Sequence, residues 1–140
     1  MRRYSNSANI MERVIAAASY FTAGIVGLLW LILTAFLKKS STFFLLFHIQ
    51  QSIFLGFSFY LIFQLYKLLF IVLVKIPLIN SIVLFFNSIL FNPLPFMWGM
   101  SLVQIFTTTL LIYLIMTSLL GLYSYVPYVS DIIKQNLGLK

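Results

Sequence analysis

Residues 43–56, FFLLFHIQQSIFLG, decide the fold. The stretch is apolar except for His48, the only histidine of the chain, and Gln50, Gln51 and Ser52. His48, Gln51 and Ser52 are spaced i, i+3 and i+4, so they share one face of a helix. A polar group in apolar surroundings is costly without a hydrogen-bond partner. We therefore expect this face to lie where helices meet and to hold them together.

The composition around this stretch favours a membrane protein. Hydrophobic residues make up 62% of the 140-residue chain and charged residues 8%, whereas a soluble domain has about 25% charged residues. A chain of this length forms one domain, and a membrane-spanning helix needs about 20 residues. We predict an all-α integral membrane bundle of four transmembrane helices, followed by a short amphipathic C-terminal helix.

The predicted organisation has three parts. A polar N-terminal tail covers residues 1–12, the four-helix transmembrane domain covers 13–126, and an amphipathic tail covers 127–140. The four spans are expected at residues 14–37, 43–66, 78–91 and 97–123. Ser41 or Thr42 is suited to cap the second of them.

Small residues mark close helix packing in the first two spans. Ser19, Ala23 and Gly27 are four residues apart, which lets another backbone approach closely. Such spacing also arises by chance in an alanine-rich helix. Ser52 and Gly56 form a second notch, on the face that carries His48.

The segment 67–77, KLLFIVLVKIP, leaves three alternatives open. It prolongs the second helix, lies in the membrane interface or begins the third span. Pro77 disfavours a helical conformation at Ile76 and suits the first turn of a new helix. We favour a break close to Pro77.

Polar residues recur in the last two spans. The repeat Asn-Ser-Ile at 80–82 and 87–89 puts Asn80 and Asn87 on one face, where they either bond a neighbouring helix or line a polar path. In the fourth span, Thr109 and Thr117 belong to a stripe at a spacing of four. Threonine hydroxyls can bond back to their own helix, so this stripe need not line a channel.

The C-terminal tail has an amphipathic pattern. The apolar residues Val129, Ile132, Ile133 and Leu137 share a helical face, and Asp131 falls outside it. This pattern predicts a short helix that lies on the membrane surface or folds back against the bundle.

The basic residues predict the orientation in the membrane. With four spans, one side holds both termini and the middle loop, and carries Arg2, Arg3, Arg13, Lys67, Lys75, Lys134 and Lys140. The opposite side carries Lys38 and Lys39. The positive-inside rule puts both termini in the cytoplasm of a cell with the chain in its inner (plasma) membrane, or in the stroma if the membrane is that of a plastid. The basic residues form no stripe, so no nucleic-acid partner is expected.

No catalytic constellation is present in the sequence. It contains no HExxH, Walker A or GxSxG motif and no pair of neighbouring carboxylates. The only acidic residues are Glu12 and Asp131, and cysteine is absent. Acid–base or metal chemistry would depend on His48 alone. We therefore expect no enzymatic activity, no cofactor and no metal site.

Three short motifs resemble the Tic-twenty family, which comprises a chloroplast inner-envelope import subunit and small bacterial relatives of unknown function. They are ERVIAA at 12–17, FHIQQSI at 47–53 and YVPYVSD at 125–131. His48, Gln51, Ser52 and Ile53 match one family pattern, and Pro127, Val129, Ser130 and Asp131 match another. The resemblance implies four spans and, for plastid members, a place in a protein-conducting complex of the plastid inner membrane. The N-terminal stretch is too short for a transit extension, which favours a bacterial or organelle-encoded relative.

Two functions follow as expectations. The first is a non-enzymatic component of a membrane protein-translocation or assembly complex, in contact with the lipid bilayer and with other membrane proteins or further copies of itself. The alternative is a small oligomeric transporter or channel with a polar path lined by His48, Asn80, Asn87, Thr109 and Thr117. We expect His48 to find its partners on the small-residue stripe of the first span or the threonine stripe of the last, away from Asp131.

Overall fold

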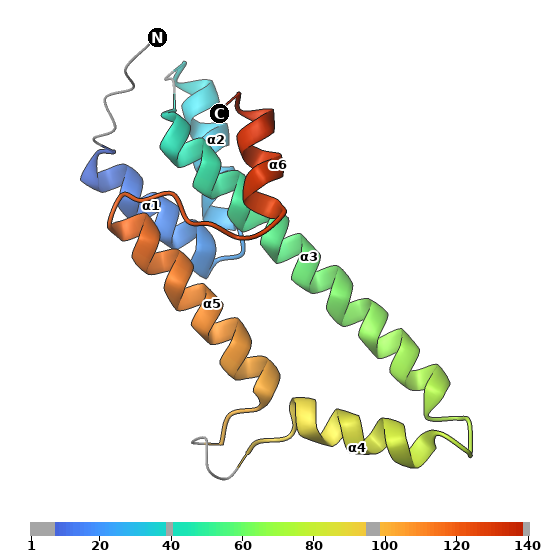
Figure 1. The fold of residues 1–140 in the computed structure, drawn as a ribbon. Coiled ribbons are helices and arrows are strands. Elements are labelled where there is room, and N and C mark those ends of the chain that lie inside the picture. The colour runs from blue at the N-terminus through green and yellow to red at the C-terminus, as the bar shows by residue number, and fades with distance from the viewer. Residues whose placement is uncertain (1–7, 39–40, 95–98, 139–140) are drawn as a thin grey trace. The chain divides into compact units, whose positions relative to one another are not determined.

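The computed structural model describes residues 8–38, 41–94 and 99–138, which form helices and connecting turns without any strand. This confirms the predicted all-α class. The described helices are α1 (Ile10–Phe21), α2 (Ile25–Phe36), α3 (Phe43–Leu73), α4 (Asn80–Phe91), α5 (Leu102–Leu119) and α6 (Val129–Asn136) (Figure 1). The chain divides into two compact units, one of Met1–Ser58 with Leu111–Lys140 and one of Phe59–Leu110. Helices α3 and α5 contribute to both units.

Two of the described helices are long and apolar enough to cross a membrane. They are α3, with 31 residues, and α5, with 18. Helices α1, α2 and α4 have 12 residues each. At 1.5 Å per residue, such a helix is about 18 Å long and falls short of a hydrocarbon core of about 30 Å. The prediction of four spanning helices is therefore wrong for the described residues, since two meet the requirement.

The predicted first span, 14–37, is broken into α1 and α2. Ala23 and Gly24 have left-handed φ angles of 51° and 93°. The Ala23 and Gly24 amides donate to the carbonyls of Tyr20 and Ser19, which is the Schellman arrangement that ends a helix. The N-cap position of α2 is Gly24, and the Thr22 hydroxyl accepts from the amide of Val26 in the first turn of α2 at 3.1 Å. The small residues that mark close packing here also end the helix.

Helix α3 is longer than predicted. It begins after Thr42, whose hydroxyl accepts from the amide of Leu45 at 3.4 Å, so the predicted cap is confirmed. It continues past residue 66 to Leu73, which decides between the three alternatives: residues 67–73 prolong the second helix. Pro77 lies in the turn between α3 and α4, as expected.

Helix α5 is shorter than the predicted 97–123. Ser101 and Gln104 cap its start, because the amide of each donates to the side-chain oxygen of the other at 3.3 Å. It ends at Leu119 and is followed by Gly121, with φ of 74°, in a second Schellman arrangement in which the Leu122 amide donates to the carbonyl of Thr117 at 2.9 Å. Residues 95–98, and the N-terminal tail up to residue 7, lie outside the described residues.

In the second unit, α4 contacts the last part of α3. The Tyr66 hydroxyl donates to Asn87 Oδ1 at 2.6 Å. The ring of Phe91 lies 4.7 Å from that of Tyr66 and 5.7 Å from that of Phe63, measured between centroids. Helix α4 has no buried residue. Its apolar side chains therefore cover the surface of this unit.

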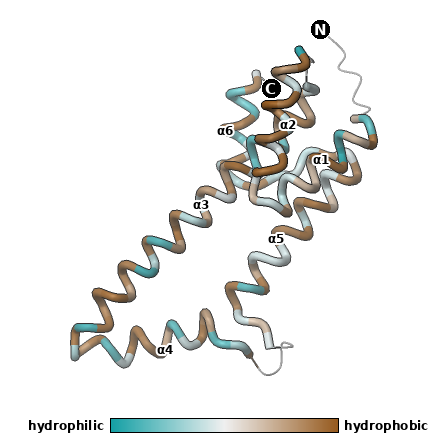
Figure 2. The backbone as a smooth tube through the Cα atoms, turned by 180° about the vertical axis from the view of Figure 1, so that it is seen from behind, coloured by the Kyte–Doolittle hydropathy of each residue, from teal (hydrophilic) through white to brown (hydrophobic). Residues whose placement is uncertain are grey.

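The first unit holds the core, and its interior is unusually polar. A small apolar group, formed by Ala16, Phe44, Leu45 and Ile49, is buried there. The buried polar side chains are Ser19, Thr34, His48, Gln51, Ser52, Ser101, Ser118, Ser124 and Ser130, and all of them except Ser101 belong to the first unit. Large apolar side chains such as Phe36 are exposed instead. Figure 2 shows the hydropathy of each residue along the backbone, which is mostly hydrophobic through α2 and includes hydrophilic residues on α6.

Candidate functional site: a buried polar cluster

Five side chains in the first unit form one buried hydrogen-bonded group, which we name the polar cluster: Tyr20, His48, Gln51, Ser124 and Ser130. Tyr20 comes from the last turns of α1, and His48 and Gln51 come from the first part of α3. Ser124 lies in the segment that connects α5 to α6, and Ser130 lies in the first turn of α6 (Figure 1). The cluster thus joins four parts of the chain.

Gln51 is the centre of the polar cluster. Its Oε1 accepts from the hydroxyls of Tyr20 and Ser124, each at 2.6 Å. Its Nε2 donates to the hydroxyl of Ser130 at 3.1 Å. One fully buried amide therefore ties α1, the segment 120–128 and α6 to α3.

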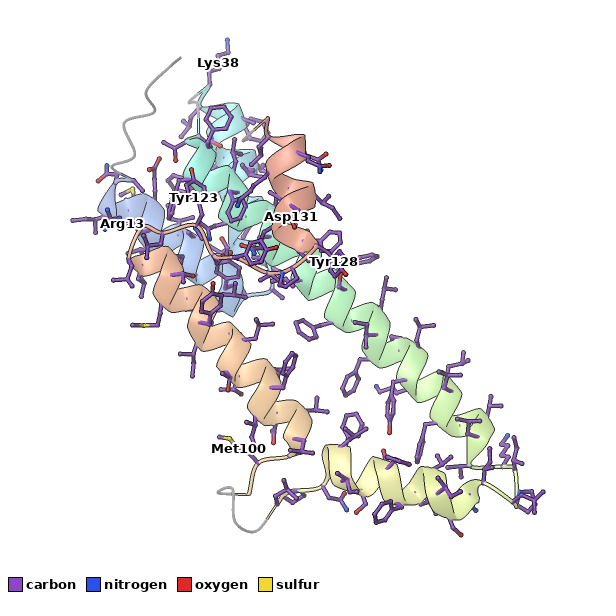
Figure 3. The ribbon with its side chains drawn as sticks, viewed as in Figure 1. Arg13, Lys38, Met100, Tyr123, Tyr128 and Asp131 are labelled. Carbon is purple, nitrogen blue, oxygen red and sulfur yellow. The ribbon has the colours of Figure 1, made fainter. Side chains whose placement is uncertain are left out.

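Both ring nitrogens of His48 have a partner. Nδ1 lies 2.8 Å from the Tyr20 hydroxyl, and Nε2 lies 3.1 Å from the carbonyl oxygen of Leu122. The Tyr123 ring stacks parallel to the imidazole, with centroids 6.2 Å apart, and the Phe44 ring meets it edge-on at 4.5 Å. Figure 3 shows Tyr123 among the helices of this unit. The imidazole is fully buried.

Ser130 fixes the start of α6. Its hydroxyl accepts from the amide of Val126 at 2.7 Å and donates to the carbonyl of Ser124 at 3.2 Å. The chain enters α6 through a turn in which the Val129 amide donates to the Pro127 carbonyl at 2.8 Å. Tyr128, at the centre of this turn, has φ of 66° and ψ of −50°, the strained geometry of a γ-turn. The bonds of Ser130 hold that strain in place.

The helices beside the polar cluster approach closely at glycine. A Cβ added at Gly56 would lie 2.8 Å from the carbonyl oxygen of Ala23, and one added at Gly27 would lie 2.8 Å from the Ile49 side chain. A Cβ at Gly24 would lie 2.8 Å from Cα of Ile53. The prediction that the small residues of the first two spans form an interface is confirmed.

The structure brings together three of the predicted site residues: His48, Gln51 and Ser130. Ser52 is buried beside them but donates to the carbonyl of Ile49 in its own helix at 2.9 Å. Asp131, which is labelled in Figure 3, is exposed, and it accepts from the Tyr125 hydroxyl at 3.3 Å. As expected, His48 bonds residues other than Asp131, namely Tyr20 and Leu122. The C-terminal tail was expected on the side opposite to His48, and this is wrong, because Gln51 of the same helix face bonds Ser130 of the tail. The tail folds back onto the first unit through the Gln51–Ser130 bond, one of its two predicted alternatives, and Ile133 of α6 is buried.

The remaining predicted residues are not collected into this site. Asn80, Asn87 and Thr109 belong to the second unit, and Thr117 belongs to the first. Thr117 donates to the Tyr113 carbonyl of its own helix at 2.9 Å, and Thr109 is exposed. Among the described residues, the buried Oδ1 of Asn80 has no hydrogen-bond partner.

Two members of the polar cluster, Tyr20 and Ser124, were not predicted. Ser124 lies among Tyr123, Tyr125 and Tyr128, and Tyr20 lies next to the small-residue stripe. The number of hydrogen bonds that Gln51 and His48 can make would have indicated that further partners such as Tyr20 and Ser124 are needed. A buried glutamine amide has two donor and two acceptor positions, and a buried imidazole has two nitrogens, so they need several partners from other segments. Tyr20 and Ser124 are polar residues outside the middle of the predicted spans.

The chemistry of the site is that of a hydrogen-bond junction. Ser124 bonds Gln51 and Ser130 bonds Gln51, so neither hydroxyl is paired with His48 as a nucleophile with its base would be. Within residues 8–38, 41–94 and 99–138, no group of three or more His, Cys, Asp or Glu side chains is arranged to hold a metal ion. A comparison of the chain with protein-family models, with curated proteins and with solved structures finds no match.

Proposed function

We propose that the chain is a non-enzymatic membrane protein that works as a component of a protein-translocation or assembly complex, as its resemblance to the Tic-twenty family implies. The observation that carries this proposal is the distribution of polarity. Buried residues of the first unit include Gln51 and Ser130, at 0% exposure, whereas Leu78 is 91% exposed and Phe36 is 83% exposed.

This distribution suits a lipid environment. In water, exposed apolar side chains are costly and the interior is apolar. In lipid, hydrophobicity gives no force between helices, and association depends on close contacts at small residues and on interhelical hydrogen bonds. The glycine contacts of α2 and α3 and the polar cluster supply both. The apolar surfaces are then available to lipid, to other membrane proteins or to further copies of the chain.

The charges support a definite orientation if α3 and α5 are the two spans. The ends of the chain before α3 and after α5 carry Arg2, Arg3, Arg13, Lys38, Lys39, Lys134 and Lys140. The other basic residues are Lys67, near the end of α3, and Lys75, in the turn after it. By the positive-inside rule, both termini are then cytoplasmic. The proposal of an inner membrane depends on the family resemblance alone.

Photo-crosslinking in the native membrane tests the proposed role. A photoreactive phenylalanine analogue replaces the exposed Phe85 of α4, and a second chain carries it at the buried Phe47 as a control. We expect Phe85 to give adducts with one defined membrane protein of a translocation or assembly machinery, while Phe47 gives only products within the chain. Adducts with lipid alone at Phe85 would refute a role in such a complex.

A polar path is the second candidate function. The supporting observation is that the buried Oδ1 of Asn80 lacks a partner among the described residues. A second asparagine, Asn87, follows it after one heptad. Flux through liposomes that contain the purified chain tests it. If ions or small solutes pass and Asn80→Leu abolishes their flux, the path is supported, and equal flux in both chains excludes Asn80 from it.

A further inference from the structure

The protons of the polar cluster do not suffice for all of its contacts when His48 is neutral. The Tyr20 hydroxyl carries one proton, but it lies within hydrogen-bond distance of two acceptors, Nδ1 of His48 at 2.8 Å and Oε1 of Gln51 at 2.6 Å. Which acceptor receives this proton depends on the charge of the imidazole.

A neutral His48 fixes one arrangement. Nε2 faces the carbonyl oxygen of Leu122, which only accepts, so the single ring proton is on Nε2. Nδ1 is then an acceptor and takes the Tyr20 proton. The Gln51 amide must turn so that its NH2 group donates to the oxygens of Tyr20 and Ser124. Its oxygen then faces Ser130 and accepts the proton of that hydroxyl.

A charged His48 fixes the reverse arrangement. Nδ1 now carries a proton and donates to the Tyr20 oxygen, so the Tyr20 hydroxyl donates to Oε1 of Gln51. The Gln51 NH2 group faces Ser130 and donates to it at 3.1 Å. The Ser130 hydroxyl is free to donate to the carbonyl of Ser124 at 3.2 Å. This arrangement uses every contact of the cluster except the 3.3 Å approach of the Tyr20 and Ser124 hydroxyls, which both donate to Gln51.

We propose that the polar cluster is a proton-responsive clasp in which the charge of His48 sets the direction of the Gln51–Ser130 bond and thereby the strength with which α6 is held. One proton from the aqueous phase binds Nδ1, no proton leaves, the Tyr20 hydroxyl rotates and the Gln51 amide turns. In the charged state Ser130 makes three hydrogen bonds. In the neutral state it loses the bond to the Ser124 carbonyl, because its only proton is given to Gln51. Helix α6 is therefore held more tightly at low pH.

No charged side chain of the described residues is paired with His48, so a charge on the imidazole acts on Gln51 and Ser130 through the Tyr20 hydroxyl. Tyr20 of α1 and Tyr123 of the connecting segment are the titratable side chains that contact the imidazole. On α1, Glu12 accepts from the amide of Asn9, and Arg13 Nε donates to the carbonyl of Ala8. On α6, Asp131 bonds Tyr125, and Lys134 lies over the same ring at 5.7 Å. Among the described residues, no charged side chain forms a hydrogen bond or an ion pair with His48.

Two spectroscopic signals measured on the full chain in lipid nanodiscs test the clasp. The ¹⁵N signals of the imidazole report the protonation of His48 without ambiguity, because it is the only histidine, provided that the purification tag contains none. A nitroxide on Gln135→Cys reports the mobility of α6 in a chain that has no other cysteine. The matched control carries the nitroxide on Ser81→Cys in α4.

The clasp predicts that the two signals titrate together. As the pH falls, we expect the imidazole to change from the form with its proton on Nε2 to the doubly protonated form. The ratio of mobile to immobile label on α6 should fall about fivefold with the same midpoint, the effect of one hydrogen bond. The label on α4 should not change. An imidazole that keeps one state from about pH 9 down to about pH 3, a range that includes the strongly shifted histidines of buried sites, refutes the clasp. A label whose mobility does not follow the protonation of the imidazole refutes it as well.

Variants separate the clasp from a general effect of pH on the fold. Ser130→Ala keeps Tyr20, His48 and Gln51 but removes the link to α6, so the imidazole should still titrate while the label no longer responds. Tyr20→Phe interrupts the same route at its other end and should also abolish the response, which covers the case in which one variant does not fold. A response that persists in either folded variant refutes the clasp.

Discussion

Tyr20 is the residue whose single hydroxyl reaches most of the polar cluster. It lies within hydrogen-bond distance of His48, Gln51 and Ser124 at 2.8, 2.6 and 3.3 Å. In Tyr20→Phe the volume of the ring is kept, but buried polar groups lose a partner. We expect the free energy of unfolding, measured by reversible denaturation in mixed micelles, to fall by about 1–3 kcal/mol.

Tyr128→Phe is the matched control for this change. Tyr128 is 83% exposed (Figure 3), so the loss of its hydroxyl should change the free energy of unfolding by less than about 0.5 kcal/mol. Equal effects of the two variants would mean that the hydroxyl of Tyr20 contributes nothing beyond a surface group.

Gly56 tests the close approach of the helices. A Cβ at this position would lie 2.8 Å from the backbone oxygen of Ala23, which cannot move without moving the turn between α1 and α2. We expect Gly56→Ala to lower the free energy of unfolding by about 1–3 kcal/mol, the cost of overpacking, although alanine favours a helix. Ser81→Ala, at an exposed position of α4, should cost nothing in the same assay. If Gly56→Ala stabilised the chain, the contact with Ala23 would not exist in solution.

At the scale of residues, the sequence predicts which α3 side chains are buried but not all of their partners. His48, Gln51 and Ser52 follow from helical spacing within an apolar run, and all three are buried. Ser124 could not be found in this way, because it lies in a segment without regular structure, where no periodicity relates it to α3. Its contact with Tyr20 spans 104 residues of sequence.

At the scale of elements, the turn between α1 and α2 gives the sharpest test. Gly24 and Gly138 both have a left-handed φ, of 93° and 68°. Alanine at either position should therefore lower the free energy of unfolding by about 1–2 kcal/mol, because its Cβ disfavours a left-handed conformation. Only at Gly24 would the new Cβ also meet a backbone, that of Ile53, whereas nothing lies within 4 Å at Gly138. We expect Gly24→Ala to lower the thermal midpoint clearly more than Gly138→Ala, and equal shifts would contradict the contact between this turn and α3.

The ends of elements were the least predictable part of the fold. Hydropathy is continuous through 14–37, so it gives no sign of the break that the left-handed residues Ala23 and Gly24 make. The same apolar continuity carries α3 through Lys67 to Leu73, although lysine marks a membrane boundary in many spans. The cap at Thr42 and the turn at Pro77 were predictable, because both depend on local backbone chemistry.

At the scale of the whole molecule, the position of two lysines distinguishes the two-span topology from a four-span topology. Lys38 precedes α3, and Lys75 follows it. With α3 and α5 as the spans, Lys75→Cys should react from outside the cell with a membrane-impermeant maleimide, and Lys38→Cys should react only after permeabilisation. Four spans predict the opposite result for each residue. The native chain contains no cysteine, so the unmodified protein is a blank control.

The order in which the polar cluster is made has a consequence for synthesis. Tyr20, His48 and Gln51 leave the ribosome long before Leu122, Ser124 and Ser130, the later residues with which they are bonded in the finished fold. Until those later residues have also left the ribosome, the imidazole of His48 and the amide of Gln51 lack these partners, and unpaired polar groups are costly at membrane depth. The bonds that hold α6 and the connecting segment therefore also satisfy the polar side chains of α3, and they can form only after synthesis has passed residue 130.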